Sequence, residues 1–435
     1  MNTIPQLAES IRVVLEDSAL EAGQSSGFIA RERKFNGATF TQTLVFSWMG
    51  NPAATLEEMS QIATVLGVEV SRQGIAKRFT AEAAALMQAV LKAAVTQTVQ
   101  GTQAAFKILS PFNGVYIVDS TIIQLPEALL EVWRGSGGGR KGQQNAGVKL
   151  SLRWNWQTGE LAGPELQAAR SHDQSAQVAA PNLPANSLQI ADLGYFSLKR
   201  FQQLAQQGAY WLSQYKTGTL VFAPCGTALN LPRLLESYTV DRLTRTVRLG
   251  QRQQVSCHLM AQRLPDDVAA RRREQLRKDA QREGYRLTHA RWVLAGWLVL
   301  VSNVPHSLLT FDQCFLVYRV RWQIELLFKL WKSEGLLDEW RTTNPWRILC
   351  EFYAKLVALL IQHWLLITGC WQRPERSLFQ ACRVIQRLAW ALAFTLRFAV
   401  LFDLFLSLIH HCLASGSAIS KQQARPPTFQ RLLAA

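Results

Sequence analysis

The stretch from Tyr318 to Lys332, YRVRWQIELLFKLWK, constrains the fold more than any other part of the chain. Its uncommon side chains are Tyr318, Arg321, Glu325 and Lys332. At about 100° per residue in an α-helix, these four positions fall within roughly 60° of one another and predict one polar stripe. The remaining side chains are mostly apolar, which predicts a helix that is buried nearly all round.

A buried carboxylate on such a stripe needs a cation or a metal ion beside it. One interpretation pairs Glu325 with Arg321, because residues four apart on a helix lie side by side. The other makes Glu325 a metal ligand. The stripe alone leaves both interpretations open, so the rest of the chain has to decide between them.

The charge balance predicts an anionic partner. The 435 residues carry a net charge of +16, and 48% of them are hydrophobic, enough for more than one domain. Nucleic acid is the expected partner, and a merely soluble basic protein is the alternative. The seven cysteines include no C-x-x-C and predict reduced intracellular thiols, mostly in the core, without a zinc site.

Two apolar regions bear on the location of the protein. Met1–Ala22 mixes acidic and basic residues with apolar ones and does not resemble a signal peptide. Leu388–Ile409 is long enough to span a bilayer, but Arg397 and Asp403 inside it favour a buried bundle helix. The sequence therefore predicts a soluble, cytoplasmic protein without a membrane partner.

Residues 1–100 are predicted to be helical and to bind DNA. Thr55–Leu66 and Ser71–Phe79 form two candidate helices around Gly67, as in a helix-turn-helix. The alternative is an ordinary helical hairpin. The residues expected to contact DNA are on the second helix: Arg72, Lys77 and Arg78.

Two short apolar runs each end in an acid. Val115–Val118 precedes Asp119, and Leu188–Ala191 precedes Asp192. If these strands are neighbours in a sheet, their carboxylates come together. A hairpin is predicted between them, from strands at Val148–Trp156 and Leu161–Ala168.

The remaining chain divides into a mainly β block and a helical end. The charged run Arg271–Arg286 within the block is expected to be helical or mobile. Helices are expected at Ile348–Ile367 and about Ser377–Cys412, before a disordered tail. The strands predicted in the block are Tyr210–Leu212, Thr219–Phe222, Thr239–Leu249, Gln254–Arg263 and Trp292–Val301.

Asp119, Asp192 and Glu325 together would suit Mg²⁺ or Mn²⁺, which accept carboxylate and phosphate oxygens. Two such ions can activate a water or a 3′-hydroxyl and stabilise the leaving oxygen at a phosphorus. Tyr318, Arg321 and Lys332 would then donate hydrogen bonds to backbone phosphates beside the acids.

The pattern Y-x2-R-x3-E-x6-K resembles the YREK signature of DDE transposases from bacterial insertion sequences, the group that includes hairpin-forming cut-and-paste enzymes. Asp119 followed by Ser120-Thr121 resembles the family's first acid, and Asp192 in ADLGYF resembles the second. Leu193 follows Asp192 where some members have Arg.

The resemblance implies an α/β fold, in which a mainly β insertion interrupts an RNase H-like catalytic core. It implies Asp119, Asp192 and Glu325 as catalytic metal ligands, and the cleavage of transposon ends with joining to target DNA. Trp297 resembles the residue that holds a flipped base, with Trp292 as the competing choice. The expected regions are 1–100 (DNA-binding), 101–208 and 301–340 (core), 209–300 (insertion) and 341–435 (helical).

The resemblance also implies double-stranded DNA as partner, a homodimer joined through the helical C-terminal region, and a bacterial nucleoid-associated location. Two alternatives stay open. A metal-dependent endonuclease of the same fold would cut DNA without a strand-joining product. A catalytically inactive DNA-binding regulator would bind the ends without cutting them.

Overall fold

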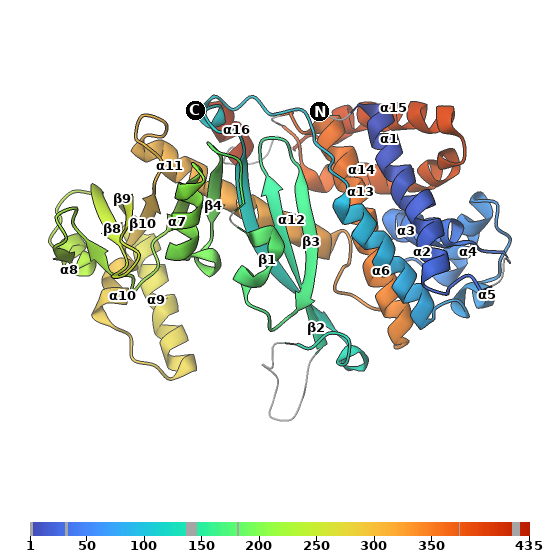
Figure 1. Cartoon of the computed structure of the whole chain (residues 1–435), viewed down its shortest axis with the longest axis horizontal. Helices are drawn as coiled ribbons and strands as arrows, with labels where there is room; N and C mark the ends of the chain where they lie inside the picture. The colour runs from blue at the N-terminus through green and yellow to red at the C-terminus, as the bar shows by residue number, and fades with distance from the viewer. Residues whose placement is uncertain (1–2, 31–33, 136–145, 181, 374, 420–426) are drawn as a thin grey trace. The chain divides into compact units, whose positions relative to one another are not determined.

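The computed structural model describes residues 3–30, 34–135, 146–180, 182–373, 375–419 and 427–435 (Figure 1). The chain forms two compact units. The first, here called the terminal unit, comprises Met1–Ala105, Ser120–Val178 and Gln323–Arg431. The second, the central unit, comprises Phe106–Asp119, Ala179–Trp322 and Leu432–Ala435.

The N-terminal part of the terminal unit is helical, as predicted. Capping residues set the helix starts: before α4, the Thr55 hydroxyl accepts from the Glu58 backbone N–H, and the Glu58 carboxylate accepts from that of Thr55. Helix α3 is buried along almost its whole length because it packs against α2, α13 and α14. The six α-helices are α1 (Ile4–Arg12), α2 (Ser18–Ser25), α3 (Gly37–Gly50), α4 (Leu56–Val65), α5 (Arg72–Ala76) and α6 (Ala81–Thr96).

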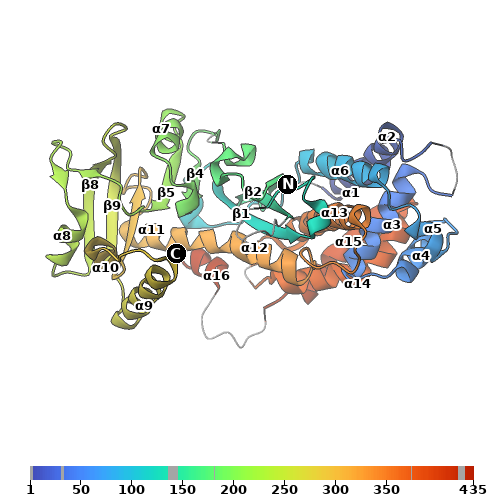
Figure 2. The same ribbon diagram turned by 90° about the horizontal axis from the view of Figure 1, so that it is seen from below.

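The C-terminal part of this unit adds α13 (Pro345–Cys370), α14 (Leu378–Leu396), α15 (Ala399–Gly416) and the start of α16 (Thr428–Leu433), whose last two residues belong to the central unit. Figure 2 shows the N-terminal helices gathered around α13, α14 and α15. The prediction of a disordered tail is wrong for α16, in which Leu432 is fully buried. The tail residues 420–426 lie outside the described residues.

Two described helices, α13 and α15, are long and apolar enough to span a membrane. The apolar window of α13 is 100% buried within the protein, whereas that of α15 is only 22% buried. The prediction of one buried helix across Leu388–Ile409 is therefore wrong. Phe398 takes an extended conformation between α14 and α15, and Arg397 donates to the Val65 carbonyl oxygen at 3.2 Å.

Strand β1 (Val115–Leu125) contributes to both units, its first five residues to the central unit and the rest to the terminal unit. Strands β2 (Ala146–Asn155) and β3 (Leu161–Ala168) form the predicted antiparallel hairpin. Strand β2 is the neighbour of β1, and β3 is the edge strand.

Within the central unit the strand order, starting at the first half of β1, is β1-β4-β5-β10-β9-β8-β6-β7. Strands β4 (Leu188–Ala191) and β5 (Tyr210–Gln214) run parallel to β1, and β10 (Trp297–Ser302) is antiparallel to β5. The outer strands are β6 (Val221–Phe222), β7 (Ala228–Leu229), β8 (Arg242–Leu249) and β9 (Val255–Arg263). The protein is therefore a mixed α/β structure with a large sheet.

Residues 209–300 contain more helix than a mainly β block would. The charged run forms α9 (Asp266–Glu283), where pairs such as Arg271–Asp267 lie one turn apart. Trp292 lies in α10 (His289–Leu294), so the prediction of a strand from Trp292 is wrong and the strand begins at Trp297. The other helices of the unit are α7 (Leu198–Gln206), α8 (Leu231–Glu236) and α11 (Phe311–Tyr318).

Candidate active site

Asp119 and Asp192 come from neighbouring parallel strands. Val118 pairs with Ala191, so each acid directly follows a residue of that pair. Paired positions on parallel strands lie about 5 Å apart and their side chains leave the same face of the sheet. The condition that the sequence left open, that the two strands are neighbours in the sheet, is met. Strand β1 does not end at Asp119, however, but continues to Leu125.

A cation lies beside the second acid. The Arg321 guanidinium is 3.4 Å from the Asp192 carboxylate, and the arginine side chain is only 11% exposed. Arg321 also stacks over the Trp322 ring, at 5.1 Å. Burial raises the pKa of the neighbouring Tyr318 to about 12, although the charge of Arg321 opposes the shift. The phenol therefore stays protonated at neutral pH, as a hydrogen-bond donor.

The stretch that carries these side chains is not one helix. Helix α11 ends at Tyr318, a 3₁₀ turn covers Arg319–Arg321, and α12 covers Trp322–Ser333. A 3₁₀ turn has three residues per turn, so the predicted single stripe at 100° per residue does not hold. The prediction of burial all round is also wrong, because Trp322 and Leu326 are exposed.

Glu325 and Lys332 both lie on α12. Glu325 is half-buried in the first turn. The Lys332 ammonium donates to the backbone carbonyl oxygen of Ile122 on β1, at 3.2 Å. Helix α12 is therefore tied to the second half of β1 within the terminal unit.

The acids have the donor chemistry of a divalent cation site. Carboxylate oxygens are the ligands that Mg²⁺ and Mn²⁺ prefer. Asp119 and Asp192 belong to the central unit and Glu325 to the terminal unit. Across the described residues, no three His, Cys, Asp or Glu side chains are gathered closely enough to hold a metal ion.

A polar cluster that was not predicted from the sequence lies directly after the first acid. Ser120 and Lys149 both donate to one oxygen of Asp173, at 2.9 and 2.8 Å. Burial raises the pKa of Asp173, but the bonds from Lys149 and Ser120 outweigh it and leave the pKa lowered. The only signal in the sequence is a lysine in the otherwise apolar start of β2.

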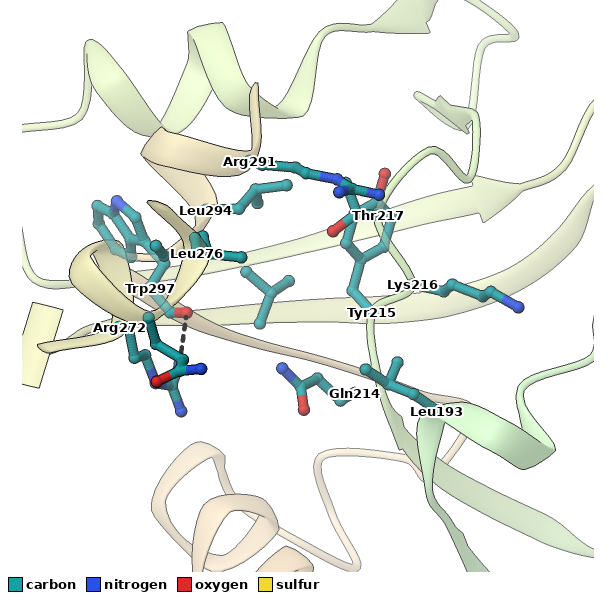
Figure 3. Close-up of a pocket in the computed structure, with 13 residues that line it drawn as sticks. Leu193, Gln214, Tyr215, Lys216, Thr217, Arg272, Leu276, Arg291, Leu294 and Trp297 are labelled. Carbon is teal, nitrogen blue, oxygen red and sulfur yellow. Dashed lines mark hydrogen bonds between the residues drawn. The ribbon is translucent and has the colours of Figure 1, made fainter. Parts of the chain in front are cut away.

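A cavity of about 530 Å³ lies in the central unit. Figure 3 shows Trp297 and Leu276 on one side of it and Gln214, Tyr215 and Lys216 on the other. Arg272 donates to the Trp297 backbone oxygen, at 3.5 Å. The cavity is lined by apolar side chains such as Leu276 and Val299, with amide and cationic groups beside them. Such a lining suits a flat ligand that has polar edges.

The two candidate tryptophans have different surroundings. Trp297 is buried on the cavity wall, and the Arg263 guanidinium lies 4.5 Å from its ring centroid. Trp292 is half-buried on α10, with Arg273 and Arg277 at 5.0 and 4.6 Å from its ring. Cations therefore contact both rings, and only Trp297 is among the residues that line the cavity described here.

The predicted DNA-reading helices are present as α4 and α5. Arg72 and Lys77 are exposed. Arg78 is half-buried, with its guanidinium 5.1 Å from the Phe28 ring centroid. Helix α5 has only five residues, so it is shorter than the predicted Ser71–Phe79.

Comparison with known proteins points in one direction. Residues 110–361 match the sequence profile of a family described as "Transposase DDE domain". The chain is 27% identical over 383 residues to the transposase for insertion sequence element IS231F of Bacillus thuringiensis subsp. israelensis, covering 82% of this chain and 79% of the relative. It is 21% identical over 385 residues to the transposase for IS1151 of Clostridium perfringens, covering 83% and 81%.

Proposed function

The chain belongs to the transposase DDE domain family and is an enzyme that acts on DNA; from this premise we propose that it cleaves the ends of an insertion sequence and joins them to target DNA. The observation that supports the proposal is the parallel pairing of β1 with β4, in which the residue before Asp119 lies opposite the residue before Asp192. The proposed pathway is cut-and-paste, through a hairpin at the cleaved end.

The proposed metal ligands are Asp119, Asp192 and Glu325. When bound, Mg²⁺ or Mn²⁺ would activate the attacking oxygen and stabilise the leaving oxygen. The role of the chain is to supply and orient the carboxylates. Arg321 contacts Asp192, so it orients one ligand and offsets negative charge at the same time.

The donors near the acids have distinct proposed roles. Arg321 presents a planar fork that matches a phosphate, and Tyr318 offers a protonated phenol. The Lys332 ammonium already donates to Ile122, so part of its role is to hold β1 against α12 while its charge attracts the DNA backbone.

The cavity beside Trp297 is proposed to receive an unstacked base. A volume of about 530 Å³ accommodates a nucleobase, and Leu276, Leu294 and Val299 supply apolar contact. Arg263 covers the Trp297 ring, so the base would replace that guanidinium to stack on the indole. Trp292 remains the alternative.

Binding along the duplex is proposed to use the exposed Arg72 and Lys77 with Arg78. The net charge of +16 supports attraction to DNA before any base is read. A cytoplasmic, nucleoid-associated location follows from a DNA substrate.

Two copies are proposed to pair through α14 and α15. Leu401, Leu404 and Leu408 are exposed at the three- and four-residue spacing of a coiled-coil seam. With Trp390, Phe394, Phe398 and Val400, they expose roughly 600 Å² of apolar side chain, against about 800 Å² per partner in a standard interface. Each copy would then hold one element end.

The test is incubation of the purified protein with Mg²⁺ and a labelled duplex that carries the element end, with Glu325→Ala as the comparison. The proposal expects cleavage and joining to a plasmid by wild type only. Cleavage without a joined product would favour the endonuclease. Tight binding without cutting by either protein would favour the inactive regulator.

A further inference from the structure

The cluster of Ser120, Lys149 and Asp173 is partly buried in the terminal unit beside β1: Lys149 is buried, whereas the Asp173 side chain is 33% exposed. Lys149 is 7% exposed, and its ammonium donates to the Ser171 backbone oxygen and, at 2.8 Å, to Asp173. The Ser120 hydroxyl donates to the same Asp173 oxygen, at 2.9 Å. One carboxylate oxygen therefore joins β1, β2 and the turn that follows β3.

The cluster is attached to β1 one residue after the first acid. Successive side chains of a strand point to opposite faces, so Ser120 lies on the face opposite Asp119. Lys332 holds the same segment from α12, through the Ile122 carbonyl oxygen. The backbone that follows Asp119 is thus held by hydrogen bonds from side chains of other elements.

A second ion pair of the terminal unit helps to separate a stabilising role of this cluster from an orienting role. Lys355 and Glu351 on α13 form a more deeply buried pair, at 2.7 Å, and their side chains are 2% and 5% exposed. Replacing a buried ion pair with apolar groups is often neutral, so such pairs give little net stability. A charged cluster next to a candidate metal ligand is better explained by the orientation that its directional bonds impose.

We propose that Ser120, Asp173 and Lys149 are positioning residues, which hold β1 so that the Asp119 carboxylate is oriented for a divalent cation. The inference rests on the proposed function, because it assumes that Asp119 is a ligand. It assigns the three residues an effect on metal affinity that passes through the strand, without contact with DNA or with the metal.

The measurement is Mn²⁺ binding to the full chain by titration calorimetry, with Asp119→Ala as the reference for loss of the site. Ser120→Ala removes one hydroxyl and should raise the Mn²⁺ dissociation constant about tenfold, the lower end of the range for outer-shell partners. Ser120→Thr keeps the hydroxyl and should restore affinity. The neutral pair Lys149→Met with Asp173→Asn should weaken binding as Ser120→Ala does.

The matched control is Lys355→Met with Glu351→Gln, which neutralises the buried pair on α13. It should leave the Mn²⁺ dissociation constant unchanged even if the melting temperature falls. Equal loss of affinity in the control would indicate general loosening and overturn the inference.

Two further outcomes separate this inference from the proposed function. Mn²⁺ binding that depends on Asp119 but not on Ser120 or the Lys149–Asp173 pair would overturn the positioning role alone. If the wild-type protein shows no Mn²⁺ binding that is lost in Asp119→Ala, the proposed metal site does not exist. That outcome would overturn both the positioning role and the proposed function.

Discussion

The acid-bearing strands and the helix pair α4–α5 use charge in opposite ways. At the strands, Asp192 is in contact with Arg321, a cation whose side chain is only 11% exposed. On α5, Arg72 and Lys77 are exposed to solvent. Burying a charge costs desolvation free energy, which is offset where the charge orients a neighbouring group. Exposed cations instead add affinity for DNA, and salt weakens that affinity. The comparison predicts that chemistry and binding can be lost separately.

The largest expected effect is at the strands. Asp119→Asn keeps the size of the side chain but removes the charge of a proposed metal ligand, so the cleavage rate should fall about 1,000-fold, since metal coordination supplies several kcal/mol. The dissociation constant for the uncut duplex should hardly change. Single-turnover cleavage and equilibrium binding on the same duplex measure both. A comparable loss of binding would contradict the separation.

Arg321→Lys should have a smaller effect at the same place. Lysine keeps the charge but loses the planar fork that contacts Asp192, so the cleavage rate should fall about 30-fold, or about 2 kcal/mol. The loss should appear in kcat more than in KM, because orientation is what changes. An unchanged kcat would show that charge alone suffices.

The smallest expected effect is on α5. Lys77→Ala should raise the dissociation constant for DNA only a few-fold and lower the salt slope by about 1, as for loss of one phosphate contact. Cleavage at saturating protein should be unchanged. Lys92→Ala, which removes an exposed lysine from α6, is the matched control. The same fall in salt slope for both variants would refute a special role for α5.

The strands that carry the two candidate aspartates could be predicted from the sequence, because local patterns of apolar residues encode them. Apolar runs that end in Asp119 and Asp192 indicate strands, and the structure confirms that these strands are parallel neighbours. The Lys149–Asp173 contact was missed because it joins residues that are 24 positions apart. Neither residue type nor spacing indicates such a contact without knowledge of the turn between them.

Two other errors have a different physical origin. Helical periodicity predicted one helix over Tyr318–Lys332, but it does not register the 3₁₀ turn at Arg319–Arg321. Hydrophobicity predicted a buried helix near Leu388–Ile409, but composition alone does not indicate which part of the protein covers an apolar face. Helix α13 is covered by its own chain, and much of α15 is not.

The terminal unit is built from an N-terminal and a C-terminal part of the sequence, which affects how the chain folds during synthesis. Helix α3 ends at Gly50 and packs against α13, whose last residue, Cys370, is synthesised 320 positions later (370−50). A ribosome that adds about 5–20 residues per second needs roughly 15–65 s to cover that interval. Until then the apolar surface of α3 has no α13 to cover it, so a nascent or truncated chain is a substrate for chaperones and proteases. A chain that ends before α13 therefore lacks part of the core around α3.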